Sequence, residues 1–166
     1  MRVDTATRDD VEAIRDVARA SWEHDYPDIL SSESLQAGVD EWYSTDSIRD
    51  SVDWPRASVL VARVDGTVVG FVHAVFDTDR DEGNVLRLYV EPEYRDAGVG
   101  RALLEAVRDE LFDRGAERLR AMVLAANDPG NAFYEHLGFE LDGESEVGVG
   151  GETYTEHTYV LEPDTE

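Results

Sequence analysis

The sequence predicts an α+β fold in which about four helices flank a mixed β-sheet of about six to seven strands. Segments with alternating apolar residues, typical of strands, are interspersed with segments in which apolar residues recur every three or four positions, typical of helices. Residues 85–90 and 118–124 are two such strands separated by a helical segment, and strands joined by a crossover of this length lie parallel. Asp65-Gly66 between two other strands is a hairpin signal, which predicts antiparallel pairing there.

Length and composition limit the classes of protein to which this chain can belong. With 166 residues and 42% apolar content, the chain suits a single domain over residues 1–166 with one core. No apolar run approaches the roughly 18 residues of a membrane span, and the first ten residues lack the apolar region of a signal peptide. The absence of cysteine excludes disulfides, thiolate metal sites and a cysteine nucleophile. We therefore expect a cytoplasmic protein without a membrane partner.

The charge is strongly negative. The chain has 38 acidic residues against 15 basic ones, a formal net charge of -23, and every basic residue is arginine. Self-repulsion at this charge density destabilises a compact fold, but salt at molar concentration screens it. We hypothesise a halophilic protein from a salty cytoplasm, and an acidic mesophilic surface is the alternative. Nucleic acid is not an expected partner, because no basic face is available to contact phosphates.

The N-terminal half of the chain is predicted to contain two helices and three strands. The predicted elements are a strand at residues 2–6, a helix at 8–20, a second helix from Ser31 or Ser32 toward Trp42, and strands at 59–64 and 68–76. Thr7 can cap the first helix, and Ile14 and Val17 belong to its apolar face. An aromatic and polar segment, residues 21–27, follows this helix and is broken by Pro27. Residues 43–57 are polar, and no element is assigned to them.

The C-terminal half is predicted to contain the crossover unit and a final hairpin. The predicted elements are an acidic loop at residues 77–83, a strand at 85–90, a helix at 99–113, a strand at 118–124, a short helix at 131–137, and strands at 139–146 and 153–161. Gly115 suits a left-handed end to the long helix, and Gly138 stops the short one. The glycine-rich segment 148–151 joins the last two strands.

The turn at residues 95–100 has the properties of an anion site. It delivers a strand into a helix N-terminus, where free N–H groups and the helix dipole favour negative charge. Its glycines allow a phosphate to approach the backbone, and Arg95 and Arg101 could add donors. The turn is not a P-loop, because no Gly-Lys-Ser/Thr follows it. A glycine turn before an ordinary amphipathic helix is the structural alternative.

Two motifs together resemble the GNAT superfamily of acetyl-CoA-dependent N-acetyltransferases. Arg95-x-x-Gly98-x-Gly100 resembles the pyrophosphate loop of that family, and Leu88-Tyr89-Val90-x-Pro92 is a frequent lead-in to it. Asn127, followed by Phe133-Tyr134 and Leu137-Gly138-Phe139, resembles its second motif. The order of elements over residues 1–161 also matches, so the resemblance implies the fold of this family, with two parallel strands that splay at the cofactor site.

The resemblance also implies where acetyl-CoA binds. The cofactor would lie between the strands of residues 85–90 and 118–124, with its pantetheine along the free edge of the first strand and its pyrophosphate against residues 95–101. The cofactor-binding residues that it implies are Leu88, Tyr89, Val90, Arg95, Asp96, Ala97, Gly98, Val99, Gly100, Arg101, Asn127, Asn131 and Phe133. Tyr134 would lie near the thioester sulfur.

The implied activity is transfer of the acetyl group to a primary amine. Without cysteine, direct attack in a ternary complex is the economical mechanism. The Val90 N–H is the expected oxyanion donor, and Tyr134 is the expected general acid, with a core aromatic as the alternative. Relatives often carry a glutamate where this sequence has Asn84, and Glu82 is our candidate base.

Other sources of the base remain open. Glu23 or His24 could act through a water molecule, or the amine could arrive already neutral. Trp22 and Tyr26 are expected to line the acceptor channel, although they could instead cover a sheet edge. No metal is expected, because neither His136 nor His157 has the spacing of a metal ligand.

The partners are expected to be an amine acceptor and, in a homodimer, a second copy of the chain. Aminoglycosides, polyamines, amino acids and protein amines all remain open as acceptors. The alternative function is a non-catalytic acyl-CoA sensor or interaction module on the same fold, and a third hypothesis is a nucleotide-binding protein that uses the same glycine loop.

Overall fold

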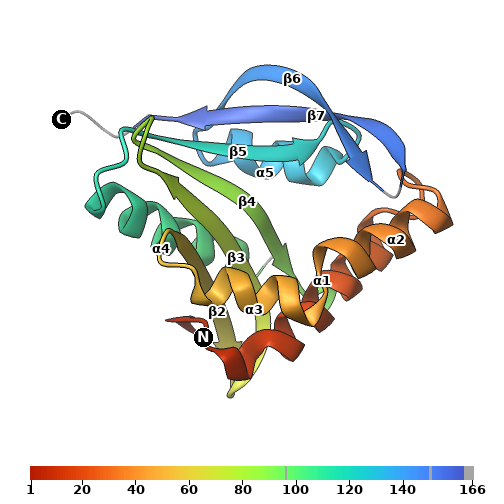
Figure 1. Cartoon of the computed structure of the whole chain (residues 1–166), viewed down its shortest axis with the longest axis horizontal. Coiled ribbons are helices and arrows are strands. Elements are labelled where there is room, and N and C mark those ends of the chain that lie inside the picture. The colour runs from red at the N-terminus through yellow and green to blue at the C-terminus, as the bar shows by residue number, and fades with distance from the viewer. Residues whose placement is uncertain (96, 150, 163–166) are drawn as a thin grey trace.

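A computed structural model describes residues 1–95, 97–149 and 151–162 of the chain (Figure 1). Its strands are β1 (Arg2–Thr5), β2 (Ala57–Val64), β3 (Thr67–Asp77), β4 (Glu82–Val90), β5 (Arg118–Leu124), β6 (Glu140–Val149) and β7 (Glu152–Leu161). Its α-helices are α1 (Val11–Asp25), α2 (Ser32–Trp42), α3 (Thr45–Asp53), α4 (Val99–Asp113) and α5 (Asp128–His136). Two short 3-10 helices, η1 (Arg8–Asp10) and η2 (Pro92–Tyr94), precede α1 and α4.

The strands form one seven-stranded sheet in the order β1-β2-β3-β4-β5-β7-β6. The pair β4–β5 is parallel and the other five pairs are antiparallel, so the predicted mixed sheet is confirmed. The hairpin predicted at Asp65-Gly66 joins β2 to β3. Both residues have positive φ, 52° and 81°, as a tight primed turn requires.

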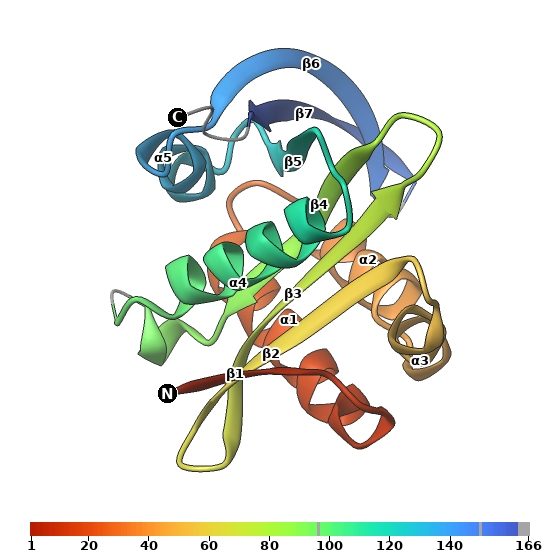
Figure 2. The same ribbon diagram turned by 90° about the vertical axis from the view of Figure 1, so that its left-hand side faces the viewer.

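The sheet divides the core into two layers (Figure 2). On one face, α4 and α5 bury residues such as Leu103, Val107 and Tyr134. On the other face, α1, α2 and α3 bury Ile14 and Trp22 among others. The helical spacing of apolar residues predicted α1, α2 and α4, and α1 and α4 each bury an apolar stripe against the sheet. The turn at residues 127–130 and the stop at Gly138 predicted the short helix that corresponds to α5.

The middle of the sheet opens between β4 and β5 (Figure 1). The two strands pair only from Glu82 to Val85 of β4, and they diverge beyond that point. A bulge at the β3–β4 pair accompanies the divergence, because His73 pairs with Arg87 whereas Ala74 pairs with Val85. The second half of β4 therefore has a neighbour on its β3 side only.

Several elements differ from the sequence prediction, three of them near the site or its supporting helices. Helix α3 occupies part of the unassigned segment 43–57, where the pattern is weak because Ile48 is its only buried residue. Helix α1 continues five residues past the predicted end, because Trp22 packs in the same core as the rest of its apolar face. Strand β4 begins at Glu82, inside the predicted acidic loop, because residues 82–85 pair with β5.

Candidate active site

A cavity of about 920 Å³ lies where β4 and β5 diverge. Thirteen of the predicted site residues line it: Trp22, Tyr26, Leu88, Tyr89, Val90, Arg95, Gly98, Val99, Gly100, Arg101, Asn127, Phe133 and Tyr134. Glu82, Ala97 and Asn131 are not among the lining residues, and Asp96 lies outside the described residues. The tertiary structure thus brings two motifs that are thirty residues apart in the chain to one cavity.

The free edge of β4 presents backbone hydrogen-bonding groups to this cavity. Glu91 donates its N–H to the Val69 carbonyl on β3, at 2.8 Å. In an antiparallel pair, alternate residues turn both backbone groups to the partner strand. Val90 and Leu88 therefore turn theirs to the opposite side, where β5 has moved away. This edge can pair with an extended ligand that carries amides.

The N-terminus of α4 forms the second binding feature. Gly98 caps the helix in a left-handed conformation, with φ of 81°, and no side chain caps the first turn. The N–H groups at the start of the helix are therefore available for an anion. A Cβ at Gly100 would lie 3.3 Å from the Phe133 ring, so glycine permits the close contact between this turn and α5.

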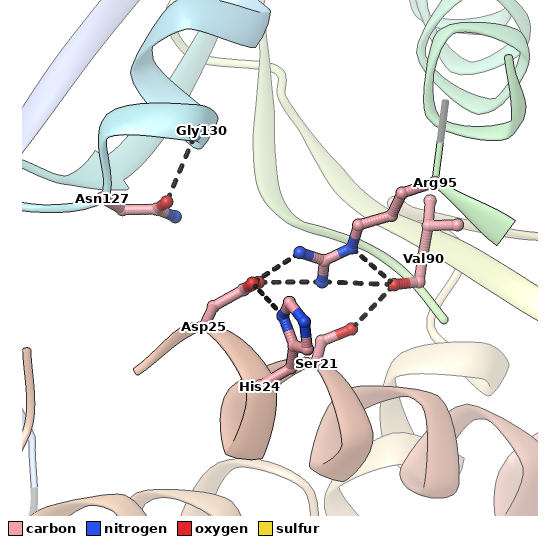
Figure 3. A network of polar contacts seen from close by, with 7 residues as sticks. All are labelled: Ser21, His24, Asp25, Val90, Arg95, Asn127 and Gly130. Carbon is pink, nitrogen blue, oxygen red and sulfur yellow. Dashed lines mark hydrogen bonds and ion pairs between the residues drawn. The ribbon is translucent and has the colours of Figure 1, made fainter. Parts of the chain in front are cut away.

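Arg95 is held against α1 (Figure 3). Its guanidinium donates to both carboxylate oxygens of Asp25, at 2.5 and 2.8 Å, and to the Val90 carbonyl at 3.3 Å. The Ser21 hydroxyl donates to the same carbonyl, at 3.1 Å. Burial alone would raise the pKa of Asp25, but hydrogen bonds from Arg95 and His24 outweigh it and lower that pKa. The Arg95 guanidinium was expected to contact phosphate, and in the structure its hydrogen bonds connect α1 to the end of β4.

Arg101, Asn127 and Asn131 were also predicted to bind the cofactor, and the structure places them differently from one another. Arg101 is exposed in the first turn of α4 and pairs with Glu105 at 2.7 Å. Asn127 caps α5 by accepting the Gly130 N–H at 3.2 Å, and it lines the cavity. Asn131 is enclosed between α5, β5 and β7, where its side chain donates to the Asn127 carbonyl at 2.7 Å.

Tyr134 enters the cavity from α5. Its ring is 6% exposed and lies edge-on to Phe133 and Phe139, with centroid separations of 5.3 Å in both pairs. Burial raises the pKa of the Tyr134 phenol well above its ordinary value. The hydroxyl therefore stays protonated at neutral pH and can donate a proton or a hydrogen bond.

Aromatic side chains of α1 close the opposite side of the cavity. Trp22 and Tyr26 are both nearly inaccessible to solvent and meet edge to face, with a centroid separation of 5.1 Å. Glu156 of β7 and Val149 of β6 line the same cavity. Val149 belongs to the glycine-rich hairpin 147–152, which was expected to contribute to the acceptor pocket, whereas Glu156 was not predicted as a site residue.

Glu82 lies outside the cavity. It is 7% exposed at the start of β4 and accepts a hydrogen bond from the Arg120 side chain of β5. Arg120 also pairs with Asp142 of β6, at 3.2 Å. The structure therefore places the candidate base in an ion pair at the closed end of the β4–β5 pair, away from the opening, because residues 82–85 are the part of β4 that pairs with β5.

Residues 12–139 match the Acetyltransferase (GNAT) family. The chain belongs to this family. It is an acetyltransferase, and acetyl-CoA is the acetyl donor of the family, as the two motifs implied. No cluster of three potential metal-binding side chains occurs among the described residues. None of the helices in the described part of the chain is long and apolar enough to cross a membrane.

Similar proteins include several acetyltransferases. A spermidine N(1)-acetyltransferase of Thermoplasma acidophilum is 29% identical over 138 residues, which cover 81% of this chain and 84% of that protein. An uncharacterized N-acetyltransferase of Mycobacterium tuberculosis is 28% identical and covers 92% of this chain and 96% of its own length.

Solved GNAT structures share the fold over nearly the whole chain. The crystal structure of the PaiA N-acetyltransferase of Thermoplasma acidophilum in complex with coenzyme A has a TM-score of 0.88, with 24% identity and 98% coverage of both chains. A ribosomal-protein-alanine N-acetyltransferase from Brucella melitensis has a TM-score of 0.74, with 22% identity and coverage of 98% and 100%. The predicted GNAT fold is confirmed.

The cavity carries groups whose chemistry suits acetyl-CoA. The uncapped N-terminus of α4 suits the pyrophosphate, because backbone N–H groups and the helix dipole both favour anions. The open edge at Leu88 and Val90 suits the amide-bearing pantetheine arm. Phe133 and Tyr134 cover the same side of the opening. Phe133 and Tyr134 lie on the face of the sheet that α4 and α5 cover.

Proposed function

We propose that this chain, acting as one domain, transfers an acetyl group from acetyl-CoA to a primary amine by direct attack in a ternary complex. The observation that carries this proposal is a cavity that reaches both faces of the sheet at the β4–β5 opening. The anion site of α4 and Tyr134 lie on one face, and Trp22 and Tyr26 lie on the other. The two substrates can therefore approach from opposite faces and meet at the opening.

The residues around the opening support specific roles in this reaction. The amine nitrogen forms a bond to the thioester carbonyl carbon, and the carbonyl oxygen takes up negative charge. The Val90 N–H, which faces the opening, would stabilise that oxyanion. Collapse then breaks the carbon–sulfur bond, and the Tyr134 hydroxyl would protonate the leaving thiolate. The high pKa of Tyr134 keeps this proton in place until the thiolate forms.

The relatives suggest which amines to test. Named activities among similar proteins include acetylation of spermidine and of a ribosomal-protein alanine, and an aminoglycoside 6'-acetyltransferase shares the fold. The test is thiol release from acetyl-CoA with spermidine, a peptide with N-terminal alanine, and kanamycin, measured at molar KCl. Turnover with at least one amine is expected. Binding of acetyl-CoA without turnover with any amine would support the sensor function instead.

The variant Tyr134→Phe tests the general acid. We expect kcat to fall about 100-fold, since a positioned acid typically contributes at least that factor, while the Kd for acetyl-CoA changes little because the ring remains. Tyr154→Phe is the matched control, because its hydroxyl contacts Glu152 outside the cavity. An unchanged kcat in Tyr134→Phe would show that another group, or water, protonates the thiolate.

A further inference from the structure

An amine that is protonated in solution must lose a proton before it can attack, so the acceptor side of the cavity needs a base. Among the described residues that line the cavity, Asp25, Glu156 and His136 are the carboxylates and imidazole that could accept this proton. Their surroundings differ, and these differences identify one of them.

Asp25 and His136 are poorly suited to this role. Asp25 binds both terminal nitrogens of Arg95, and its lowered pKa makes it a weak base. His136 lies in the last turn of α5, two residues after Tyr134. Because α5 covers the same face of the sheet as α4, the His136 ring approaches from the side that the cofactor would occupy.

The alternation of side chains along β7 places Glu156 on the acceptor face. His157 and Tyr159 contact Asn131 of α5, at 2.7 and 2.6 Å, so they point to the α4–α5 face. Tyr154 points the other way, because its hydroxyl accepts a hydrogen bond from the N–H of Ser31 at the start of α2. Side chains two positions apart share a face of a strand, so Glu156 faces α1 and α2 together with Tyr154.

The cross-strand neighbours of Glu156 support the same placement. Glu156 pairs with Leu124, the last residue of β5, and Leu124 belongs to the core layer that contains Trp22 and Tyr26. Its partner on β6 is Ser145. The carboxylate therefore lies at the end of β5, where the sheet opens, on the face lined by the α1 aromatics.

We propose that Glu156 is the general base that removes a proton from the acceptor amine, a role that rests on the proposed transfer reaction. No hydrogen bond or ion pair to another described residue occupies its carboxylate. Besides Glu156, the titratable groups among the described residues that line the cavity are Asp25, Tyr26, Arg87, Tyr89, Tyr94, Arg95, Arg101, Tyr134 and His136.

The surroundings of Glu156 also affect how readily its carboxylate accepts a proton. Burial raises the pKa of Glu156, which brings it closer to neutral pH. In the reaction, the ammonium loses one proton to Glu156, and the neutral nitrogen attacks the thioester. After the attack, the nitrogen loses a second proton to water as Tyr134 protonates the sulfur. Glu156 then releases its proton to solvent, and Tyr134 takes one up from solvent, which restores both side chains. One proton is released for each acetyl group transferred.

The test compares Glu156→Gln with Glu146→Gln in the wild-type background. Glu146 is an exposed glutamate of the same hairpin, outside the cavity, so its replacement makes the same change of charge. The dependence of kcat/KM on pH is measured from pH 5 to 9 with acetyl-CoA and the fastest amine among spermidine, the alanine peptide and kanamycin. Titration calorimetry with coenzyme A reports on the integrity of the cofactor site.

We expect Glu156→Gln to lower kcat/KM about 100-fold at neutral pH and to remove the rise of activity that follows ionisation of this carboxyl. The coenzyme A affinity should stay within twofold, and Glu156→Asp should recover part of the rate and the rising limb. Glu146→Gln should behave as wild type. A rising limb that survives in Glu156→Gln, or a parallel loss of coenzyme A binding, would overturn the proposal.

Failure of this role can be distinguished from failure of the proposed function. If the wild-type protein turns over no amine, the transfer reaction is refuted and this role with it. If the wild-type protein is active and Glu156→Gln keeps its rate and pH profile, only the role of Glu156 is refuted. Loss of the rising limb in His136→Gln but not in Glu156→Gln would assign the base to His136.

Discussion

Breaking the contact between Arg95 and Asp25 should weaken acetyl-CoA binding, although Asp25 is far from the pyrophosphate loop in sequence. The two side chains are 30% and 18% exposed and share two hydrogen bonds, and Arg95 also holds the Val90 carbonyl. A hydrogen bond to a charged group contributes about 1.5–3 kcal/mol, and solvent screening at a partly exposed pair reduces this to about 1–2 kcal/mol. We expect this amount as the coupling energy between the two residues.

A double-mutant cycle measures this coupling. The variants are Asp25→Asn, Arg95→Gln and the two combined, with Arg108→Gln on an outer part of α4 as the control. Each single variant should weaken acetyl-CoA binding about 5- to 10-fold, which corresponds to about 1–1.4 kcal/mol, because the end of β4 and the loop lose the same support. The double variant should be no weaker than either single variant, and titration calorimetry provides the affinities.

The opposite pattern would refute this reasoning. If Arg95 contributes mainly as a phosphate ligand, Asp25→Asn releases its guanidinium toward the cofactor. Affinity would then be unchanged or higher in Asp25→Asn and lower in Arg95→Gln, and the coupling energy would be zero or would have the opposite sign. Additive losses would show that the two residues act independently.

Three further predictions concern stability. Burial, with a contribution from Arg87, lowers the pKa of His73 from 6.5 to about 4. Between pH 7 and pH 4 the free energy of unfolding should therefore fall about 3 kcal/mol more in wild type than in His73→Phe, because mainly the unfolded chain binds the proton in that range. Equal dependence of stability on pH for the two proteins in urea titrations would refute this. Gly83→Ala should lower the free energy of unfolding by about 1–3 kcal/mol, because the new Cβ would lie 2.7 Å from Leu111. Gly143→Ala is the control and should lower it much less, because no atom lies within 4 Å of the new Cβ. Similar denaturation midpoints for the two variants would contradict the packing argument. The net charge of -23 predicts a melting temperature that rises from dilute buffer to molar KCl, and an equal Tm in both would count against salt adaptation.

Much of the cofactor side could be predicted from local sequence. The strand, glycine turn and helix of residues 85–113 each depend on neighbours a few positions away, so periodicity and turn chemistry were sufficient to locate α4 and the glycine turn before it. The motif around Asn127 likewise predicted Tyr134 in the cavity.

The surroundings of individual polar groups could not be predicted in the same way. Asn131 was expected at the cofactor, but Tyr159 and the Asn127 carbonyl occupy its side chain. Glu82 was expected near the acceptor, but Arg120 of the adjacent strand binds it. In both cases the partner comes from the packing of another element, and a polar group that becomes buried takes whichever partner that packing supplies.

The sequence by itself determined the α+β class, the parallel crossover, the glycine turn before α4 and the resemblance to the GNAT family, because these depend on local periodicity and spacing. Only the tertiary structure decided that Arg95 holds Asp25 and that Glu156 lies on the same face of the sheet as Trp22 and Tyr26. The physical reason is that both arrangements depend on how α1, β5 and β7 meet at the opening of the sheet. Contacts between elements so distant in the chain are set by the packing of the whole fold.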